Sequence, residues 1–335
     1  MSSFLDPAIL FFLFGVLAGS LRSNLEIPPQ ISRFLALYLL MALGLKGGYA
    51  LSVSGFTLEV VISLGCAVGL ALIIPALSFF LLRRIVSSYD ATAIAATYGS
   101  VSAVTFITAI QYLDTRGLPY GGHMAAAMAL MESPAIVLAM VTANYLRQRT
   151  QAGGVVIASS GVAALNGPRV SRLGLGGVLH ESLTDGAQLL LLGSMLVGLL
   201  SGEAGKAAMQ PFSGDLFKGM LAFFLLDMGL LTARNLGQLK GRARALLAYG
   251  VCAPLAHGSL ALALAVAVGM SAGNGALLAV LAASASYIAV PAVLRHALPE
   301  ANASLYFGLS LGLTFPFNIL VGIPLYVAAA QRLLP

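Results

Sequence analysis

Charged side chains are scarce in this sequence. Asp, Glu, Lys and Arg make up 9% of its 335 residues, whereas hydrophobic residues make up 59%. A soluble domain carries about 25% charged residues, so this composition, with a mean hydropathy of +0.93, excludes a soluble protein. It indicates an all-α, polytopic membrane protein. The net charge of +6 does not indicate nucleic acid binding here, because the basic residues are spread through loops between apolar segments and act as topology signals.

Cysteine is rare and tryptophan is absent. The two cysteines, Cys66 and Cys252, each lie inside an apolar segment, where cysteine behaves as a small hydrophobic residue. This excludes a disulfide framework and a cysteine-based metal site. Without Trp, an aromatic belt at the membrane surface would be built from tyrosine. The candidates for such a belt are Tyr38, Tyr120, Tyr249 and Tyr326.

Signatures of enzymes and of secretion are also missing. The chain has no HExxH zinc motif, no GxSxG elbow, and no histidine paired with a nearby carboxylate on a shared helix face. The sequence therefore predicts neither enzymatic activity nor a bound cofactor. The N-terminus lacks the basic start and cleavage site of a signal peptide, so its first apolar run predicts a membrane helix.

Apolar segments of the length that crosses a bilayer, about 17 to 25 residues, recur along the chain. A polar connection at 147–186 divides them into two sets of five, and we expect it to end in a short surface helix around 180–185. The predicted spans are 7–22, 33–51, 57–82, 91–112 and 122–145, then 187–202, 216–233, 243–269, 275–294 and 302–331.

The two sets of spans align with each other at a nearly constant offset. Gly15 falls on Ser194 at an offset of 179, and Gly44 falls on Gly229 at 185. Ser100, Ser102 and Pro134 in turn fall on Ser284, Ser286 and Pro316 at 182 to 184. Because five is odd, the second copy must enter the membrane upside down. The sequence thus predicts a first repeat at 1–146, a cytoplasmic linker at 147–186 and an inverted repeat at 187–335.

Basic residues are unevenly divided between the two sets of loops. Loops after odd-numbered spans hold thirteen, namely Arg22, Arg33, Arg83, Arg84, Arg147, Arg149, Arg169, Arg172, Arg234, Lys240, Arg242, Arg244 and Arg295. The other side of the membrane holds five, namely Lys46, Arg116, Lys206, Lys218 and Arg332. Cytoplasmic loops carry the positive excess, which predicts extracytoplasmic termini in a bacterial inner membrane.

Two spans are interrupted by small and hydroxyl residues, at Ala95–Phe106 (AATYGSVSAVTF) and Leu281–Val293 (LAASASYIAVPAV). Backbone that leaves helical geometry at membrane depth must line a cavity or contact protein, and a repeated pair of such breaks is typical of a transport site. A helix that begins at a break points its free N–H groups at the cavity, which suits a small anion. The alternative is that Gly and Ser only allow close helix packing. The candidate anion-binding residues are Gly99, Ser100, Val101, Ser102, Thr105, Ser284, Ala285, Ser286, Tyr287 and Ile288.

Ionisable residues within spans are functional candidates because their burial in lipid is costly. Glu132 lies beside Pro134, where it could hold a cation or be satisfied by neighbouring hydroxyls. Asp227 could have a transport role or pair with a lysine such as Lys46, and His257 is better explained as an interior histidine. The predicted sodium ligands are Glu132, Ser102, Thr105, Ser286 and Asn318.

Six segments of the sequence together carry a resemblance to a known family. They are GSVSAVTF at 99–106, MESPAIV at 131–137, HESLTDGA at 180–187, APLAHG at 253–258, LAASASYIAVPAVLRHALPEANASLYFG at 281–308 and FPFNILVGIPL at 315–325. These motifs, in this order, resemble the sodium-dependent bicarbonate transporter family first recognised in cyanobacteria. The resemblance implies an inverted repeat of ten helices, a homotrimer, and bicarbonate and sodium bound between two crossing broken helices for uptake by alternating access. It also implies a small regulatory partner, similar to the PII signalling proteins, on the cytoplasmic face.

The sequence departs from this family pattern at the second break and in the linker. Cyanobacterial members carry Asp where this chain has Tyr287, and Gly-Pro-Pro where it has Ala289, Val290 and Pro291. Their cytoplasmic connection is also longer. Glu132 matches an acidic residue of the family, so one carboxylate is kept. The alternatives are therefore a transporter of another small anion or carboxylate without sodium coupling, a channel, or a membrane sensor or assembly protein.

Overall fold

The computed structural model describes residues 6–55, 57–152, 186–236 and 244–335. Within these ranges the regular structure is entirely helical, as predicted. The predicted linker lies largely outside them, as do residues 180–185, and α6 continues to Ala152. The helices are α1 (Pro7–Ser20), α2 (Pro29–Ser54), α3 (Leu58–Leu82), α4 (Ser88–Gly99), α5 (Ala103–Asp114), α6 (Met124–Ala152), α8 (Gly186–Met209), η2 (Gln210–Asp215), α9 (Leu216–Leu236), α10 (Arg244–Val268), α11 (Ala272–Ala283), α12 (Ala289–Ala297), α13 (Ala303–Phe307), η4 (Gly308–Thr314), α14 (Phe315–Phe317), η5 (Asn318–Gly322) and α15 (Ile323–Leu333).

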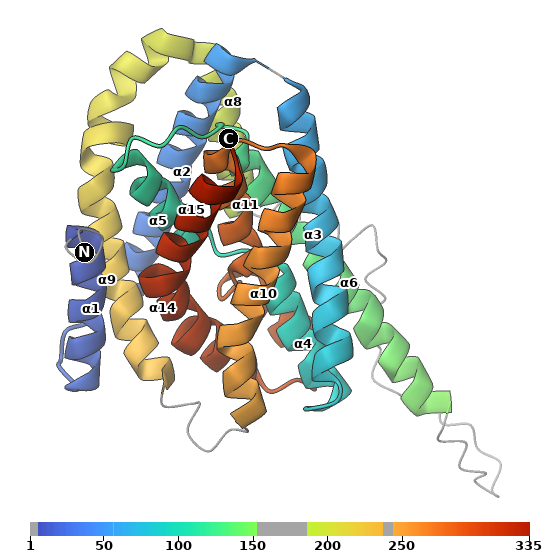
Figure 1. The fold of residues 1–335 in the computed structure, drawn as a ribbon. Coiled ribbons are helices and arrows are strands. Elements are labelled where there is room, and N and C mark those ends of the chain that lie inside the picture. Colours follow the sequence, from blue (N-terminus) through green and yellow to red (C-terminus); the bar gives the residue numbers. More distant parts are fainter. Residues whose placement is uncertain (1–5, 56, 153–185, 237–243) are drawn as a thin grey trace, which may run out of the picture.

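Seven helical segments of the described chain are long and apolar enough to cross a membrane. One of them, Gly186–Leu236, has 51 residues, or about 77 Å of helix, which is more than twice the thickness of a bilayer core. Its helical geometry is interrupted at Gly202. Figure 1 shows α8 and α9 joined at the top of the view by an arch, which consists of residues 202–215. The apolar helices α1 and α11 are shorter, at 14 and 12 residues.

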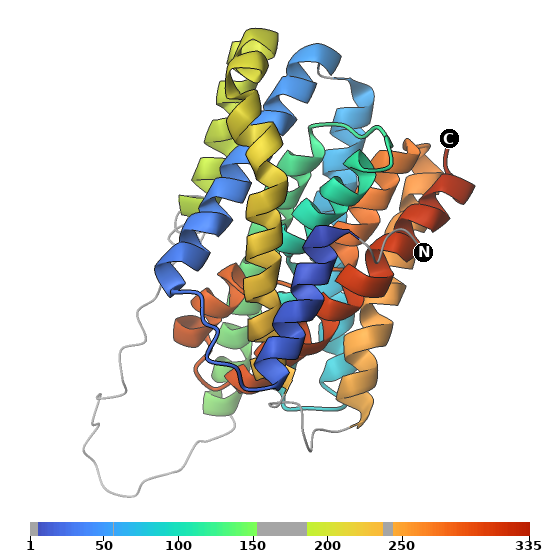
Figure 2. The same cartoon turned by 90° about the vertical axis from the view of Figure 1, so that its left-hand side faces the viewer.

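Four helices pair closely along one side of the molecule, α1 with α9 and α2 with α8, as Figure 2 shows. Glycine allows this approach. A Cβ atom on Gly15 would lie 3.1 Å from the Cα atom of Gly229, and one on Gly44 would lie 2.7 Å from the Cβ atom of Ser194. We call α1, α2, α8 and α9 the paired-helix group.

The remaining helices, α3 to α6 and α10 to α15, form the broken-helix group. Here α3 packs on α4 and α6, while α10 packs on α11. Helix α11 lies at the centre, where Leu277, Ala279 and Leu281 are fully buried. Because this helix is surrounded by protein, it can tolerate the polar break that follows it.

Both predicted breaks are confirmed. Helix α4 ends at Gly99 and α5 starts at Ala103, while α11 ends at Ala283 and α12 starts at Ala289. Between each pair the backbone leaves helical geometry, since Ser100 and Ser284 are both extended. These segments lie deep in the broken-helix group, where protein can satisfy the peptide groups.

The tyrosines expected to form a membrane-surface belt do not do so. Tyr38, Tyr249 and Tyr326 are buried, and Tyr120 is half-buried. Tyr38, for example, donates to the carbonyl oxygen of Phe212. The prediction was wrong because composition cannot distinguish a tyrosine that faces lipid from one that packs between helices.

Candidate functional site

The two breaks contact each other through hydrogen bonds that their backbone amides donate. The amide of Ser102 donates to Oγ of Ser284 at 2.9 Å, and the amide of Ser286 donates to the carbonyl oxygen of Thr97 at 2.8 Å. Each break therefore supplies one N–H group to the other. This reciprocal bonding holds the starts of α5 and α12 next to each other in the centre of the molecule.

Serine hydroxyls accept hydrogen bonds from first-turn amides of the two helices that follow the breaks. Oγ of Ser102 accepts from the amide of Thr105 at 3.2 Å, and Oγ of Ser286 accepts from the amide of Val290 at 3.3 Å. The first-turn amides of a helix have no partner within the helix. In α5 these include the amides of Ala103 and Val104, and both residues line a cavity. The start of α5 is thus a place where an anion can meet free N–H groups.

A cavity of about 1620 Å³ separates the two helix groups. Helices α2, α8 and α9 form one wall, and α5, α6, α12 and η4 form the other. Arg33, Arg234 and Arg295 line its mouth, so the cavity opens at the end of the molecule that is rich in arginine. The predicted site residues that line it are Val101, Ser102, Glu132, Ser286, Tyr287 and Ile288.

The other predicted site residues lie behind the cavity wall. Gly99 packs against Pro75 of α3, and Ser100 is buried at 1% exposure. Asn318 donates from Nδ2 to the carbonyl oxygen of Ala283 at 2.7 Å, which satisfies a group at the end of α11. The predicted residues outside the lining of the cavity are Gly99, Ser100, Thr105, Ser284, Ala285 and Asn318.

A second group of buried hydroxyls braces the first break. Oγ1 of Thr314 lies 2.6 Å from the hydroxyl of Tyr98 and donates to the carbonyl oxygen of Gly250 at 2.7 Å. Oγ1 of Thr105 donates to Oγ of Ser102 at 2.9 Å, so Thr105 acts on the cavity through Ser102. These bonds hold the chain on either side of the break in place.

Three carboxylates line the cavity, Glu26, Glu132 and Asp227, and the last two make hydrogen bonds within it. Glu132 of α6 accepts from Nε2 of Gln188 at 2.9 Å, and this bond links the two helix groups. Asp227 of α9 accepts from the hydroxyl of Ser32. The suggested pairing of Asp227 with Lys46 is wrong, because Lys46 pairs with Asp114 instead, at 3.5 Å.

Other candidate ligands do not join the site. His257 is buried within α10 and does not line the cavity, as expected of an interior histidine. Cys66 and Cys252 are both free thiols. Within the described ranges, no group of three or more His, Cys, Asp and Glu side chains could hold a metal ion. A cation in this cavity would therefore depend on single carboxylates and on neutral oxygens.

Sequence reasoning missed several residues of the cavity wall. Ser32, Arg33 and Gln188 all line it, yet each is close to the start of its helix, where polar residues are ordinary. Their sequence positions carried no signal, since only the fold brings α2 and α8 opposite the breaks.

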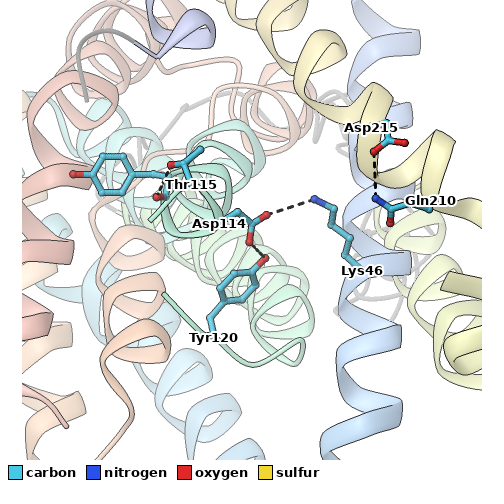
Figure 3. A network of polar contacts seen from close by, with 7 residues as sticks. Lys46, Asp114, Thr115, Tyr120, Gln210 and Asp215 are labelled. Atoms are coloured by element: carbon cyan, nitrogen blue, oxygen red, sulfur yellow. Dashed lines mark hydrogen bonds and ion pairs between the residues drawn. The ribbon is translucent and has the colours of Figure 1, made fainter. Parts of the chain in front are cut away.

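The end of the molecule opposite the arginine-rich mouth is closed. On α2 the cavity lining reaches Leu40, and Lys46 lies six residues further, or about 9 Å along the helix. Figure 3 shows Lys46 pointing at Asp114, which also accepts from the hydroxyl of Tyr120 at 2.9 Å. Burial and the nearby charge of Asp114 raise the pKa of Tyr120, so the phenol stays protonated and donates.

Two further contacts complete this closure. The ammonium group of Lys46 lies 4.1 Å from the ring centre of Phe217 in α9, a cation–π contact. A Cβ atom on Gly47 would lie 2.9 Å from the carbonyl oxygen of Gly122, so only glycine lets α2 approach this loop so closely. At this end α2 therefore packs directly on the broken-helix group. At the other end the cavity separates α2 from α5 and α12, while α9 stays in contact with η4, where Oγ1 of Thr232 donates to the carbonyl oxygen of Leu311 at 3.2 Å.

Comparison with known proteins assigns the chain to a family. No curated protein matches it, but the profile of the Na+-dependent bicarbonate transporter superfamily matches residues 7–331. This match confirms both the resemblance of the motifs and the predicted lack of enzymatic activity. The chain is therefore a multi-pass membrane transporter that belongs to the Na+-dependent bicarbonate transporter superfamily.

Proposed function

We propose that this protein is a secondary transporter that takes up bicarbonate together with sodium across the bacterial inner membrane by alternating access. The observation that carries the proposal is the cavity at the start of α5, which lies between the two helix groups and opens at the arginine-rich end, while Lys46 and Asp114 join α2 to α5 at the opposite end. A channel would instead need a pathway open at both ends.

A ten-helix inverted repeat fits the packing of the paired-helix group. Seven long segments become ten spans if the 51-residue segment counts as two spans, if the short helix α1 counts as one, and if α11 and α12 together count as one. The offset of the two halves equates Gly15 with Ser194 and Gly44 with Gly229. The close pairs are Gly15 with Gly229 and Gly44 with Ser194, so the repeat operation converts one pair into the other. A pseudo-two-fold axis relating inverted halves produces this exchange.

Bicarbonate would bind at the breaks. The amides of Ala103 and Val104 and the hydroxyls of Ser102 and Ser286 are donors suited to a small planar anion. Glu132 and the same hydroxyls offer oxygens to sodium, which would balance the charge of the anion. The substrate and the coupling ion thus share one cavity.

The arginine-rich mouth is the cytoplasmic end in this proposal, by the positive-inside rule. The structure then has an inward-open cavity, and both termini are extracytoplasmic. The homotrimer and the regulatory partner similar to PII proteins stay predictions that rest on the family resemblance.

A second candidate is transport of another small anion, such as a carboxylate, without sodium. The observation that favours it is Tyr287, whose phenol lines the cavity at the second break. A phenol is neutral near pH 7 and is a weaker sodium ligand than a carboxylate.

Uptake of radiolabelled bicarbonate into proteoliposomes tests the proposal. With purified protein and an inward sodium gradient, we expect accumulation above that in empty vesicles and in vesicles without sodium. Uptake that does not depend on sodium would reject the symport mechanism. If bicarbonate does not accumulate in the vesicles but small carboxylates do, the second candidate replaces the first.

A further inference from the structure

Asp227 is a buried carboxylate in the cavity wall that faces the breaks. It lies in the middle of α9, has 5% exposure and lines the cavity. Among the described residues its hydrogen-bond donor is the hydroxyl of Ser32, in the first turn of α2. Both residues belong to the paired-helix group, opposite the predicted site at the breaks.

The charge of Asp227 is incompletely satisfied by the protein. An ionised carboxylate offers about four acceptor positions, and Ser32 occupies one of them. Asp227 takes part in no ion pair within the described part of the chain. Arg234 is the basic residue that acts on it electrostatically. A buried charge without a direct partner is costly, so this carboxylate needs a cation or a proton.

Hydroxyl-bearing residues of the broken-helix group line the same cavity as Asp227. They are Ser102, Ser286 and Tyr287, and the hydroxyl of Tyr287 is buried with no hydrogen-bond partner among the described residues. The other charged residues that line the same cavity are Glu26, Arg33, Glu132, Arg234 and Arg295. Carboxylate and hydroxyl oxygens are the donors that hard cations prefer.

We propose that Asp227 and Ser32 bind a second sodium ion on the paired-helix wall, in addition to the one proposed at Glu132, on the side of the cavity opposite the anion at the breaks. The inference rests on the proposed function, which it deepens by naming a second carboxylate in the wall opposite the breaks. A cation on α2 and α9 attracts an anion on α5 and α12 only while the two helix groups face each other. This dependence would couple sodium binding to the position of the groups.

Binding of radioactive sodium to the purified protein in detergent tests the site without requiring transport. We expect Asp227→Asn to weaken sodium binding at least tenfold, because a neutral amide replaces the carboxylate. Ser32→Ala should weaken binding about threefold, since one neutral ligand is lost. The matched control is Asp215→Asn in the arch, where Asp215 accepts from Gln210 at 3.3 Å outside the cavity, and it should bind sodium as the wild type does.

The outcomes separate this inference from the proposed function. Loss of sodium binding in Asp227→Asn supports the site even if the wild type fails to accumulate bicarbonate. Unchanged sodium binding in Asp227→Asn overturns the site. A wild type that binds no sodium but whose uptake is driven by a pH gradient assigns Asp227 to a proton instead, and also overturns it. If Asp227→Asn fails to fold, Asp227→Glu keeps the charge and must retain sodium binding, otherwise the inference fails.

Discussion

The two ends of the molecule differ in how the paired-helix and broken-helix groups meet. At the arginine-rich end, α2 and α9 are separated from α5 and α12 by the cavity. At the opposite end, Lys46 of α2 reaches Asp114 of α5, and Gly47 touches Gly122. The cavity thus separates α2 from α5 and α12 at one end, where α9 keeps its contact with η4, while α2 packs directly on the broken-helix group at the other. Access from one end at a time is what the proposed alternating access needs.

The polar contacts at the two ends also differ in kind. The closed end has a partly exposed ion pair, whose side chains are 27% and 34% exposed. Such pairs contribute little free energy, so the ion pair itself adds little to the cost of opening this end. At the open end, the hydrogen bond between Glu132 and Gln188 joins the groups inside the cavity. Opening of one end and closing of the other would therefore exchange one small set of polar contacts for another, which suits a reversible change of state.

The largest expected effect comes from filling the open cavity. Ser286→Leu would place a branched side chain between the start of α12 and the anion site. Because this side chain would occupy the space of the anion, we expect uptake to fall about 100-fold, which corresponds to about 2.8 kcal/mol. The overpacking itself costs about 1 to 3 kcal/mol of stability, which should leave the protein folded. The check is the initial rate of bicarbonate uptake in proteoliposomes. Ser201→Leu, on the exposed face of α8, is the matched control, and equal uptake by both variants would remove the cavity from the pathway.

The next effect concerns the carboxylate at the open end. Glu132→Gln removes the charge that accepts from Gln188. A hydrogen bond to a charged group contributes about 1.5 to 3 kcal/mol, so sodium stimulation should fall by roughly a factor of 10 or more. The measurement is uptake against sodium concentration. Glu203→Gln, an exposed residue of the arch, should leave the curve unchanged; a curve for Glu132→Gln that matches it would exclude Glu132 from the ion pathway.

A smaller effect is expected from the closed end. Lys46→Met breaks the pair with Asp114 and should shift the equilibrium toward a state open at that end, by up to about fivefold for a partly exposed pair. Ile288→Cys, in the cavity lining, reports this shift when Cys66 and Cys252 are replaced by Ala. Its reaction with an impermeant thiol reagent added at the arginine-rich end should slow.

Charge reversal provides the control for this variant. Lys46→Asp combined with Asp114→Lys should restore the reaction rate of the reporter thiol, because the pair is rebuilt with its charges exchanged. If the double variant reacts as slowly as Lys46→Met, the ion pair does not stabilise the closed end.

The sequence was sufficient to predict the breaks but not the contacts made by the residues around them. Small residues and Pro291 weaken helical structure locally, so the breaks follow from short-range chemistry. The contact of Asp227 with Ser32 spans 195 positions in sequence and depends on how α9 packs against α2. No pattern in either helix could indicate it.

The sequence likewise could not predict which side chains of a break line the cavity. Ser100 and Ser102 are two residues apart and chemically identical, yet Ser100 lies behind the wall and Ser102 lines the cavity. In a helix or strand, periodicity would assign each side chain to a face. The extended backbone between α4 and α5 has no such period over three residues, so only the packed structure places them.

The smallest expected effect distinguishes contacts within one helix group from contacts between the two. Arg147 binds both oxygens of Glu300 at 2.8 Å, and both lie in the broken-helix group at the open end. These hydrogen bonds from Arg147 lower the pKa of Glu300, so the stabilisation is present above its ordinary pKa and is lost as the pH falls through the lowered one. Because Glu300 is exposed, Glu300→Gln should cost at most about 0.5 kcal/mol and make thermal stability less sensitive to acid. Thermal unfolding between neutral pH and pH values below the ordinary glutamate pKa measures this loss, and the Ile288→Cys reaction rate should not change. A changed rate would show that the ion pair at the open end, too, helps to set the balance between the two states.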